Sequence, residues 1–198
     1  SVALAGLADV VDVWVGHSND VLSRVLDEFG PRSVDMAFFD QKGTLYHVDL
    51  ETIDRLGLAS DGCLLVADNV LKPGAPRFLW DLRHSSVWNL QIVTLREYES
   101  EDIEDWISVA SFDACAEDHA APSAPRSFES LAFETDAIRW RAMTGQLHVS
   151  DWVRHVRLVR AALGEQAIVP TACVESGLVH GLTRIAAVPQ EWRQSGSR

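Results

Sequence analysis

Two aspartates and an asparagine follow apolar segments that are typical of buried strands. Asp40 comes directly after residues 34–39, and Asp68 and Asn69 come directly after residues 63–67. Carboxylate and amide oxygens are ligands that Mg²⁺ prefers, and the ion keeps positions for water and for substrate oxygens. The same residue types are also common in turns and as helix caps. The residues alone therefore leave two interpretations open, a magnesium site and ordinary turns.

The first 112 residues alternate between strand and helix signals. Segments rich in β-branched and aromatic residues predict strands at residues 10–15, 34–39, 63–67, 87–95 and 105–112. Apolar residues at helical spacing predict helices at residues 19–29, 50–58 and 76–83. Charged residues between the last two strands predict an antiparallel hairpin. The alternation is typical of an α/β fold with a parallel sheet, in which segments 34–39 and 63–67 pair.

Polar residues follow three of the expected strands, at positions 16–19, 40–42 and 68–69. Ligands of open α/β sheets bind beyond the carboxyl ends of the strands. The convergence of three polar strand ends at one edge of the sheet therefore indicates a ligand site there.

Residues 33–83 contain the strings VDMAFFD, LLVADNV and KPGAPRFL, which begin at Val34, Leu64 and Lys72. In the order and spacing of these strings, the segment resembles the C-terminal half of catechol O-methyltransferase. The resemblance extends over roughly residues 2–112. It implies a Rossmann-like sheet and the transfer of a methyl group from S-adenosylmethionine to a catechol hydroxyl, with Mg²⁺ holding both catechol oxygens.

The resemblance also assigns roles to residues on the substrate side. Asp40, Asp68 and Asn69 match the metal ligands, and Pro73 matches a proline wall against the catechol ring. Glu97 matches the carboxylate that holds the second hydroxyl.

On the cofactor side, the positions that match the surroundings of S-adenosylmethionine are Gly16, Ser18, Asn19 and Gln41. The general-base lysine of the family falls on Gly43 in this chain. Lys42 stands one residue earlier and is the candidate catalytic base.

The start of the family's fold has no counterpart in the chain. Its first strand, the glycine-containing turn that cradles the cofactor and the acidic residue that ends its second strand are missing. We therefore expect a partial methyltransferase sheet without the family's first two strands. Upstream sequence, another chain or a repacked remnant would each account for the gap. We expect the isolated chain to bind S-adenosylmethionine weakly or not at all.

Two functional interpretations follow. In the first, the protein is an O-methyltransferase-like enzyme that uses S-adenosylmethionine and Mg²⁺ and acts on a small-molecule catechol. In the second, it is a catalytically inactive remnant of that fold, binds neither cofactor, and serves as a structural or interaction subunit of a larger assembly. Protein partners or a missing upstream segment are expected in both.

The rest of the chain shows no such resemblance. Residues 1–112 are expected to form the catechol O-methyltransferase-like module, residues 113–127 a linker, and residues 128–198 a C-terminal extension that is helical or irregular. Residues 169–188 predict a strand pair or an irregular wrap.

One helix of the extension is expected at residues 151–163, with Ser150 as its N-cap. Arg154, Arg157 and Arg160 form a basic stripe on it. The stripe predicts either docking to an acidic surface, such as the first module, or a solvated helix face.

The composition of the chain limits the classes of protein to which it can belong. The chain has 198 residues, of which 47% are hydrophobic and 23% charged, so it is long enough and apolar enough to bury a core. Its net charge of -12 is the wrong sign for a protein that binds nucleic acid. No apolar run approaches the roughly 20 residues of a membrane span. Three scattered cysteines predict reduced thiols. We expect a soluble protein in a reducing compartment, either cytoplasmic or organellar.

Overall fold

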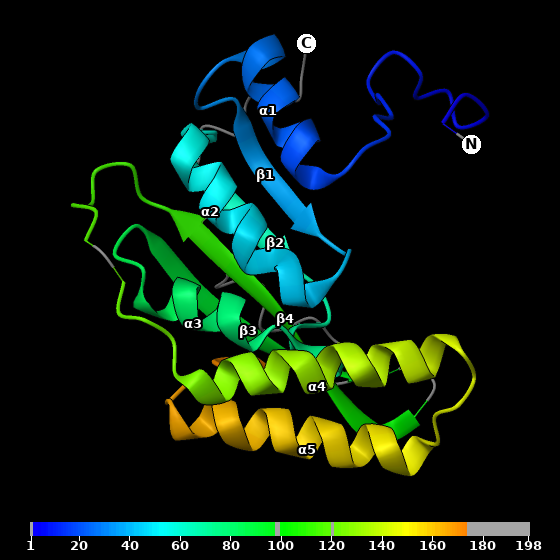
Figure 1. The fold of residues 1–198 in the computed structure, drawn as a ribbon. Helices are drawn as coiled ribbons and strands as arrows, with labels where there is room; N and C mark the ends of the chain where they lie inside the picture. The colour runs from blue at the N-terminus through cyan, green and yellow to red at the C-terminus, as the bar shows by residue number, and fades with distance from the viewer. Residues whose placement is uncertain (1, 98–99, 120, 174–198) are drawn as a thin grey trace.

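A five-stranded mixed sheet lies at the centre of the protein in the computed structural model, which describes residues 2–97, 100–119 and 121–173 (Figure 1). The side chains of residues 96–97 and 100–102 lie outside that description. Helices cover the sheet on the side that faces the viewer in Figure 1, and two further helices run side by side below it.

The strands follow the order β1-β2-β4-β3-β5 across the sheet. In chain order they span Val34–Phe39 (β1), Ala59–Ala67 (β2), Trp88–Glu97 (β3), Ser100–Phe112 (β4) and Ala172–Cys173 (β5). β1 is parallel to β2, β4 is antiparallel to both β2 and β3, and β5 is parallel to β3. The expected parallel pair and the expected hairpin are therefore confirmed, and so is the α/β class of the fold.

β1 lies at one edge of this sheet. In the described part of the chain no strand precedes it, and β2 is the strand with which it pairs. Met36 and Phe38 of β1 are 57% and 56% exposed, whereas Leu65 in the neighbouring β2 is fully buried. The sheet is thus partial on the side where the family's first strands were expected to be missing.

Three helices belong to the first module, namely α1 (Ser18–Phe29), α2 (Tyr46–Leu56) and α3 (Pro76–His84). All three were predicted, although α2 starts four residues earlier than expected because the 3-10 turn Gly43–Leu45 leads directly into it. Gly57 ends α2 with a left-handed φ of 62°, a conformation that glycine adopts without a Cβ penalty.

An aromatic cluster fixes α2 and α3 to the end of β1. The ring centroids of Phe39, Tyr46 and Phe78 lie 5.4 to 6.0 Å apart in tilted and edge-to-face arrangements, and all three side chains are buried. Such pairs stabilise a core by about 0.5–1.5 kcal/mol each beyond their buried area. The end of β1, next to Asp40, is therefore held in place by a buried aromatic cluster.

The strand expected at residues 10–15 is a wrong prediction. These residues form no strand, and Val13 and Val15 are 74% and 99% exposed. The N-terminal arm, residues 2–17, extends away from the start of α1 (Figure 1). High β-propensity is not sufficient here, because a strand needs a neighbouring ladder of hydrogen bonds and no described strand supplies one.

Two antiparallel helices, α4 (Arg126–Met143) and α5 (Val149–Glu165), form a hairpin below the sheet in Figure 1. The expected helix at residues 151–163 is confirmed within α5, but α4 was not predicted. Ser150 is not the N-cap, because α5 begins earlier. His148 precedes it and forms a capping box with Asp151.

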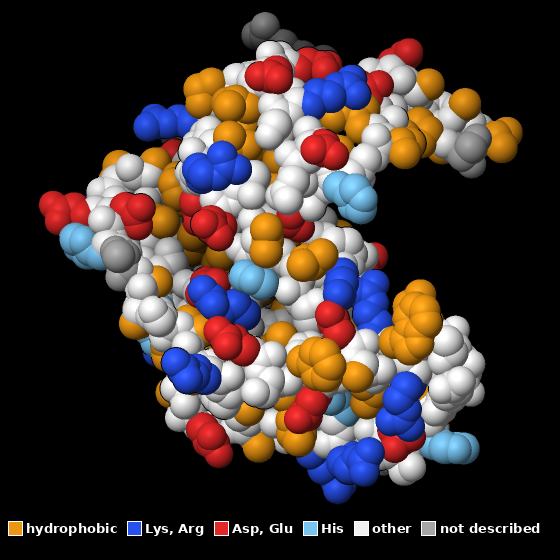
Figure 2. All heavy atoms as spheres, viewed as in Figure 1, with side chains coloured by type: hydrophobic (Ala, Val, Ile, Leu, Met, Phe, Trp, Pro, Cys, Tyr) orange, Lys and Arg blue, Asp and Glu red, His pale blue; other side chains and the backbone are white. Residues whose placement is uncertain are grey.

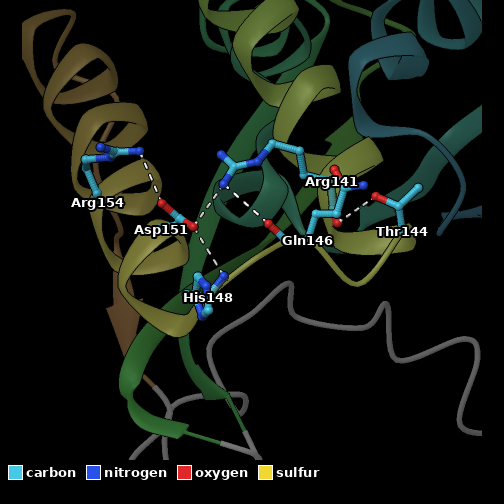
Figure 3. A network of polar contacts seen from close by, with 6 residues as sticks. All are labelled: Arg141, Thr144, Gln146, His148, Asp151 and Arg154. Atoms are coloured by element: carbon cyan, nitrogen blue, oxygen red, sulfur yellow. Dashed lines mark hydrogen bonds and ion pairs between the residues drawn. The ribbon is translucent and has the colours of Figure 1, made fainter.

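The turn of this hairpin is closed by a polar network (Figure 3). Asp151 binds Arg141 of α4 at 3.0 Å and Arg154 of α5 at 3.3 Å, and Arg141 also donates to the backbone oxygen of Gln146. Arg160, farther along α5, pairs with Glu104 of β4, so one arginine of the basic stripe contacts the first module.

The cysteines Cys63, Cys115 and Cys173 form no disulfide. Burial raises the pKa of the Cys63 thiol to about 11. No helix in the described part of the chain is both long and apolar enough to cross a membrane. β5 lies within the segment expected to form a strand pair or wrap, and the rest of that segment, residues 174–188, lies outside the described residues.

Candidate functional site

The parallel pairing of β1 and β2 brings Asp40 and Asp68 to the same edge of the sheet. The backbone N–H of Asp68 donates to the carbonyl of Phe39, the residue before Asp40, at 3.0 Å. The Tyr46 hydroxyl lies 3.2 Å from the carbonyl oxygens of both Phe39 and Asp68. One buried phenol of α2 therefore links the two strand ends that carry the predicted ligands.

The charge at this edge is negative. The pKa of Tyr46 is raised well above its ordinary value, first by burial and then by the carboxylates of Asp40 and Asp68. Asp105 adds to the same effect, and Arg139 opposes it. The phenol is therefore neutral at physiological pH, and the carboxylates create a potential that favours a cation at the strand ends.

Asn69 is held in a defined orientation. Its backbone is left-handed, with φ of 56°, and its N–H donates to the Asp68 carboxylate at 2.8 Å. Its side-chain Nδ2 donates to Oδ2 of Asp105 at 3.0 Å. Because the amide nitrogen faces Asp105, the amide carbonyl oxygen is the atom that remains available to a cation.

Asp105 organises the whole loop 69–75. This carboxylate is only 4% exposed and accepts three further backbone N–H groups, from Leu71 at 3.3 Å, Lys72 at 2.9 Å and Trp106 at 2.7 Å. Sequence reasoning assigned it no role. It was predicted to lie in the charged, solvated turn at the start of the strand 105–112, whereas the structure buries it.

The donor set fits a hard divalent cation. Asp40 is exposed, Asp68 and Asn69 are half-buried, and the three supply carboxylate and amide oxygens from adjacent strand ends. Within the described residues, no group of three or more histidine, cysteine, aspartate or glutamate side chains is arranged to hold a metal ion. The role of this trio as metal ligands stays a prediction.

Two of the expected cofactor residues, Gln41 and Asn19, contact α2. Gln41 donates to the buried Asp49 carboxylate at 2.6 Å, and Asn19, at the start of α1, accepts from the Thr52 hydroxyl at 3.4 Å. Asp49 and Thr52 lie about one helical turn apart, so the loop after β1 and the start of α1 contact neighbouring parts of the same helix.

Gly16 and Ser18 flank the beginning of α1, next to Asn19. A Cβ at Gly16 would lie 3.3 Å from Val21, so the chain approaches the helix closely here. The structure thus brings the four predicted cofactor positions to the start of α1 and the loop after β1, and their role in binding stays a prediction.

Gly43 occupies a position where no side chain fits. A Cβ there would lie 2.9 Å from the carbonyl oxygen of Gly74, a backbone atom of the facing loop. The neighbouring Lys42 points to α4, where its Nζ lies 2.5 Å from Oδ2 of Asp136. The lysine is thus held between the first module and the α4–α5 hairpin.

Pro73 lies in the facing loop, and its carbonyl accepts a hydrogen bond from Nε2 of His155 on α5 at 2.8 Å. Glu97 is the last residue of β3, and its side chain lies outside the described residues. Figure 2 shows that the molecule is hollowed between the N-terminal arm and the α4–α5 hairpin, with basic and hydrophobic side chains on the rim.

Comparison with known proteins finds sequence similarity to O-methyltransferases. Catechol O-methyltransferase of Bos taurus is 38% identical over 85 residues, which cover 43% of this chain and 31% of that protein. The Sus scrofa enzyme is 39% identical over 82 residues, covering 41% of this chain and 44% of that protein. The human transmembrane O-methyltransferase is 33% identical over 79 residues. The matched part of the chain thus spans less than half of each of these relatives.

No family model matches the chain. Among solved structures, the O-methyltransferase from Bacillus cereus in complex with SAH has a TM-score of 0.49 and 18% identity, covering 57% of this chain and 55% of that one. TomG from Streptomyces achromogenes, an O-methyltransferase in complex with SAM, has a TM-score of 0.48 and 24% identity, covering 57% and 54%. The chain therefore resembles catechol O-methyltransferase in sequence over two fifths of its length.

Proposed function

We propose that the protein is part of an O-methyltransferase that uses S-adenosylmethionine and Mg²⁺ and acts on catechol-type hydroxyls. The observation that carries the proposal is the placement of Asp40, Asp68 and Asn69 at the ends of two adjacent parallel strands. The 38% identity to a catechol O-methyltransferase supports it.

The metal would be held by the two carboxylates and the amide carbonyl, which the geometry at the strand ends suits. When bound, the cation would lower the pKa of a phenolic hydroxyl and hold it as an oxygen ligand. Asp105 supports this role, because it fixes the amide of Asn69 and the backbone after it. Pro73 would lie against the ring of the substrate, and Glu97 would accept the second hydroxyl.

The cofactor would lie against Gly16, Ser18, Asn19 and Gln41, near the start of α1. These residues would orient the adenosine portion, and proximity of the methyl donor to the acceptor oxygen supplies much of the rate in such reactions. The chain spans only part of its relatives, so we expect residues 1–198 alone to bind S-adenosylmethionine weakly.

The decisive test is Mg²⁺-dependent thermal stabilisation of the wild-type chain and of Asp68→Asn. A metal site gives a rise in Tm that grows with Mg²⁺ concentration by mass action, and Asp68→Asn abolishes it. The matched control is Asp61→Asn, because Asp61 is an exposed carboxylate of β2 that accepts from Ala114 N and lies outside the strand ends. Equal stabilisation of wild type and Asp68→Asn would contradict the metal site.

The alternative is a catalytically inactive module of this fold within a larger assembly. Gly43 is the observation that favours it, because the lysine of the family has no room at this position. Isothermal titration of S-adenosylmethionine and an assay of methyl transfer to a catechol, both on the full-length protein with Mg²⁺, separate the two functions. Absence of both binding and transfer would support the inactive module.

A further inference from the structure

The α4–α5 hairpin contacts both loops of the candidate site. Asp136 of α4 uses its two carboxylate oxygens on the loop of residues 40–45 that follows β1. Oδ1 accepts from the Thr44 hydroxyl at 2.7 Å, and Oδ2 pairs with Nζ of Lys42 at 2.5 Å. Arg139, one turn farther along α4, lies 3.5 Å from the backbone oxygen of Gln41. The hairpin thus binds this loop on both sides of Gly43.

α5 binds the other loop, residues 69–75, in a comparable way. The His155 ring is buried, and its Nε2 donates to the Pro73 carbonyl at 2.8 Å. Val159, one turn later, packs so closely on Gly74 that a Cβ there would lie 3.3 Å from its side chain. Lys72 of the same loop lies with Nζ 5.0 Å from the ring centre of Trp152.

We propose that the hairpin is a structural part of the site, with Asp136 the positioning residue for Lys42 and His155 the positioning residue for the loop that carries Pro73. The identity of the ligand at the two loops rests on the proposed function. The positioning of Lys42 and of the Pro73 loop by the hairpin does not depend on it. Asp136 determines where the Lys42 ammonium lies, because Nζ of Lys42 pairs with its Oδ2.

The sequence makes this testable, because Lys42 and Lys72 are the two lysines of the chain. Asp136→Asn removes the charge and keeps the size, and Asp151→Asn makes the same change at the turn of the hairpin, away from both loops. We expect Lys42 in Asp136→Asn to be acetylated by acetic anhydride about five-fold faster than in wild type, measured by peptide mass spectrometry. Lys72 is the internal reference, and Asp151→Asn leaves both rates within about two-fold.

Amide hydrogen exchange gives the second measurement. Asp136→Asn should speed exchange in residues 40–45 about five-fold, and His155→Leu should do so in residues 69–75, each with little effect on the other loop. Asp136→Glu, which keeps the charge, should restore slow acetylation of Lys42. Unchanged Lys42 acetylation and unchanged exchange in Asp136→Asn would overturn the proposal, and so would equal effects of Asp151→Asn.

Catalysis is measured separately on the full-length protein. If methyl transfer occurs, Asp136→Asn should lower kcat about five-fold with the cofactor KM unchanged, and Asp136→Glu should recover part of the loss. An unchanged kcat would overturn the positioning role of Asp136 in the reaction. If no methyl transfer is found, the proposed function fails, while acetylation and exchange still decide whether the hairpin positions the loops.

Discussion

The two loops at the carboxyl edge of the sheet are held by different kinds of contact. Loop 69–75, after β2, is fixed from inside by the buried Asp105, which accepts hydrogen bonds from its backbone and from Asn69. Loop 40–45, after β1, is fixed from outside by the pair of Lys42 and Asp136, whose side chains are 40% and 38% exposed.

This difference separates a rigid half of the site from an adjustable one. A buried carboxylate with several donors is insensitive to salt, and its loss leaves those donors unpaired. A half-exposed ion pair is screened by salt and contributes little to stability. We therefore expect loss of the Asp105 contacts to affect folding, and loss of the Lys42–Asp136 pair to affect mainly local geometry.

The largest effect should come from Asp105→Ala. The change leaves four N–H donors without their acceptor, and we expect it to lower the free energy of unfolding by about 3 kcal/mol. Asp113→Ala is the control, because exposed Asp113 accepts one backbone N–H, from Cys115, and its loss should cost less than about 1 kcal/mol. Urea denaturation measures both, and equal losses would show that Asp105 does not hold the loop.

The contact between the two loops predicts the next effect. Gly43→Ala places a Cβ 2.9 Å from the Gly74 carbonyl, and we expect a loss of about 1–3 kcal/mol in urea denaturation. Gly164→Ala in α5 meets no atom within 4 Å and should gain about 0.5–1 kcal/mol, because alanine favours the helix. A neutral Gly43→Ala would show that the loops separate easily.

The comparison also predicts a pH dependence for the rigid loop. Burial lowers the pKa of His155 in the folded protein, against the raising effects of the Pro73 carbonyl and of Glu134. The unfolded chain then binds the proton more readily, so the His155 contribution is complete above the ordinary pKa near 6.5 and is lost as pH falls below it. Tm should therefore drop more steeply from pH 7 to 5 in wild type than in His155→Gln.

His47 provides the matched control for this measurement. Burial also lowers its pKa, but it lies in α2, and the charged groups that act on it belong to α2 and α3 rather than to residues 69–75. His47→Gln should flatten the same Tm profile without changing amide exchange in residues 69–75, whereas His155→Gln should change both. A Tm profile of His155→Gln that matches wild type would contradict the role assigned to burial of His155.

The smallest effect should be the response of the adjustable loop to salt. Asp136→Asn should cost about 1 kcal/mol at low ionic strength, and the cost should vanish near 1 M NaCl because exposed pairs are screened. The cost of Asp105→Ala should stay constant over the same range. A salt-independent effect of Asp136→Asn in urea denaturation would show that this pair behaves as a buried one.

The elements that the sequence predicted well are those whose signal is local. β1, β2 and the β3–β4 hairpin have apolar segments bounded by polar residues, and the edge of the sheet that carries Asp40 and Asp68 followed from their parallel pairing. The prediction for residues 10–15 used the same kind of signal and was wrong, because a strand also requires a partner that the local sequence does not reveal.

The contacts that hold the loops could not be predicted in the same way. The hydrogen bond between Asp105 and Asn69 joins residues that are 36 positions apart in the chain, and the one between Asp136 and Thr44 joins residues that are 92 positions apart. Polarity alone suggested surface positions for such residues, since charged side chains are seldom fully buried unless paired. Their roles became visible only when α4 was found beside the loop after β1 and β4 beside the loop after β2.

The approach of Gly43 to the Gly74 carbonyl also constrains the order in which this site can change. The resemblance to catechol O-methyltransferase predicts a general-base lysine at position 43, but here any residue larger than glycine meets backbone rather than a movable side chain. A lysine could therefore be gained only after residues 70–74 had withdrawn, and that withdrawal would first disturb the Asn69 and Pro73 surroundings. A side chain at position 43 and the backbone at position 74 therefore compete for the same space, and neither can change independently of the other.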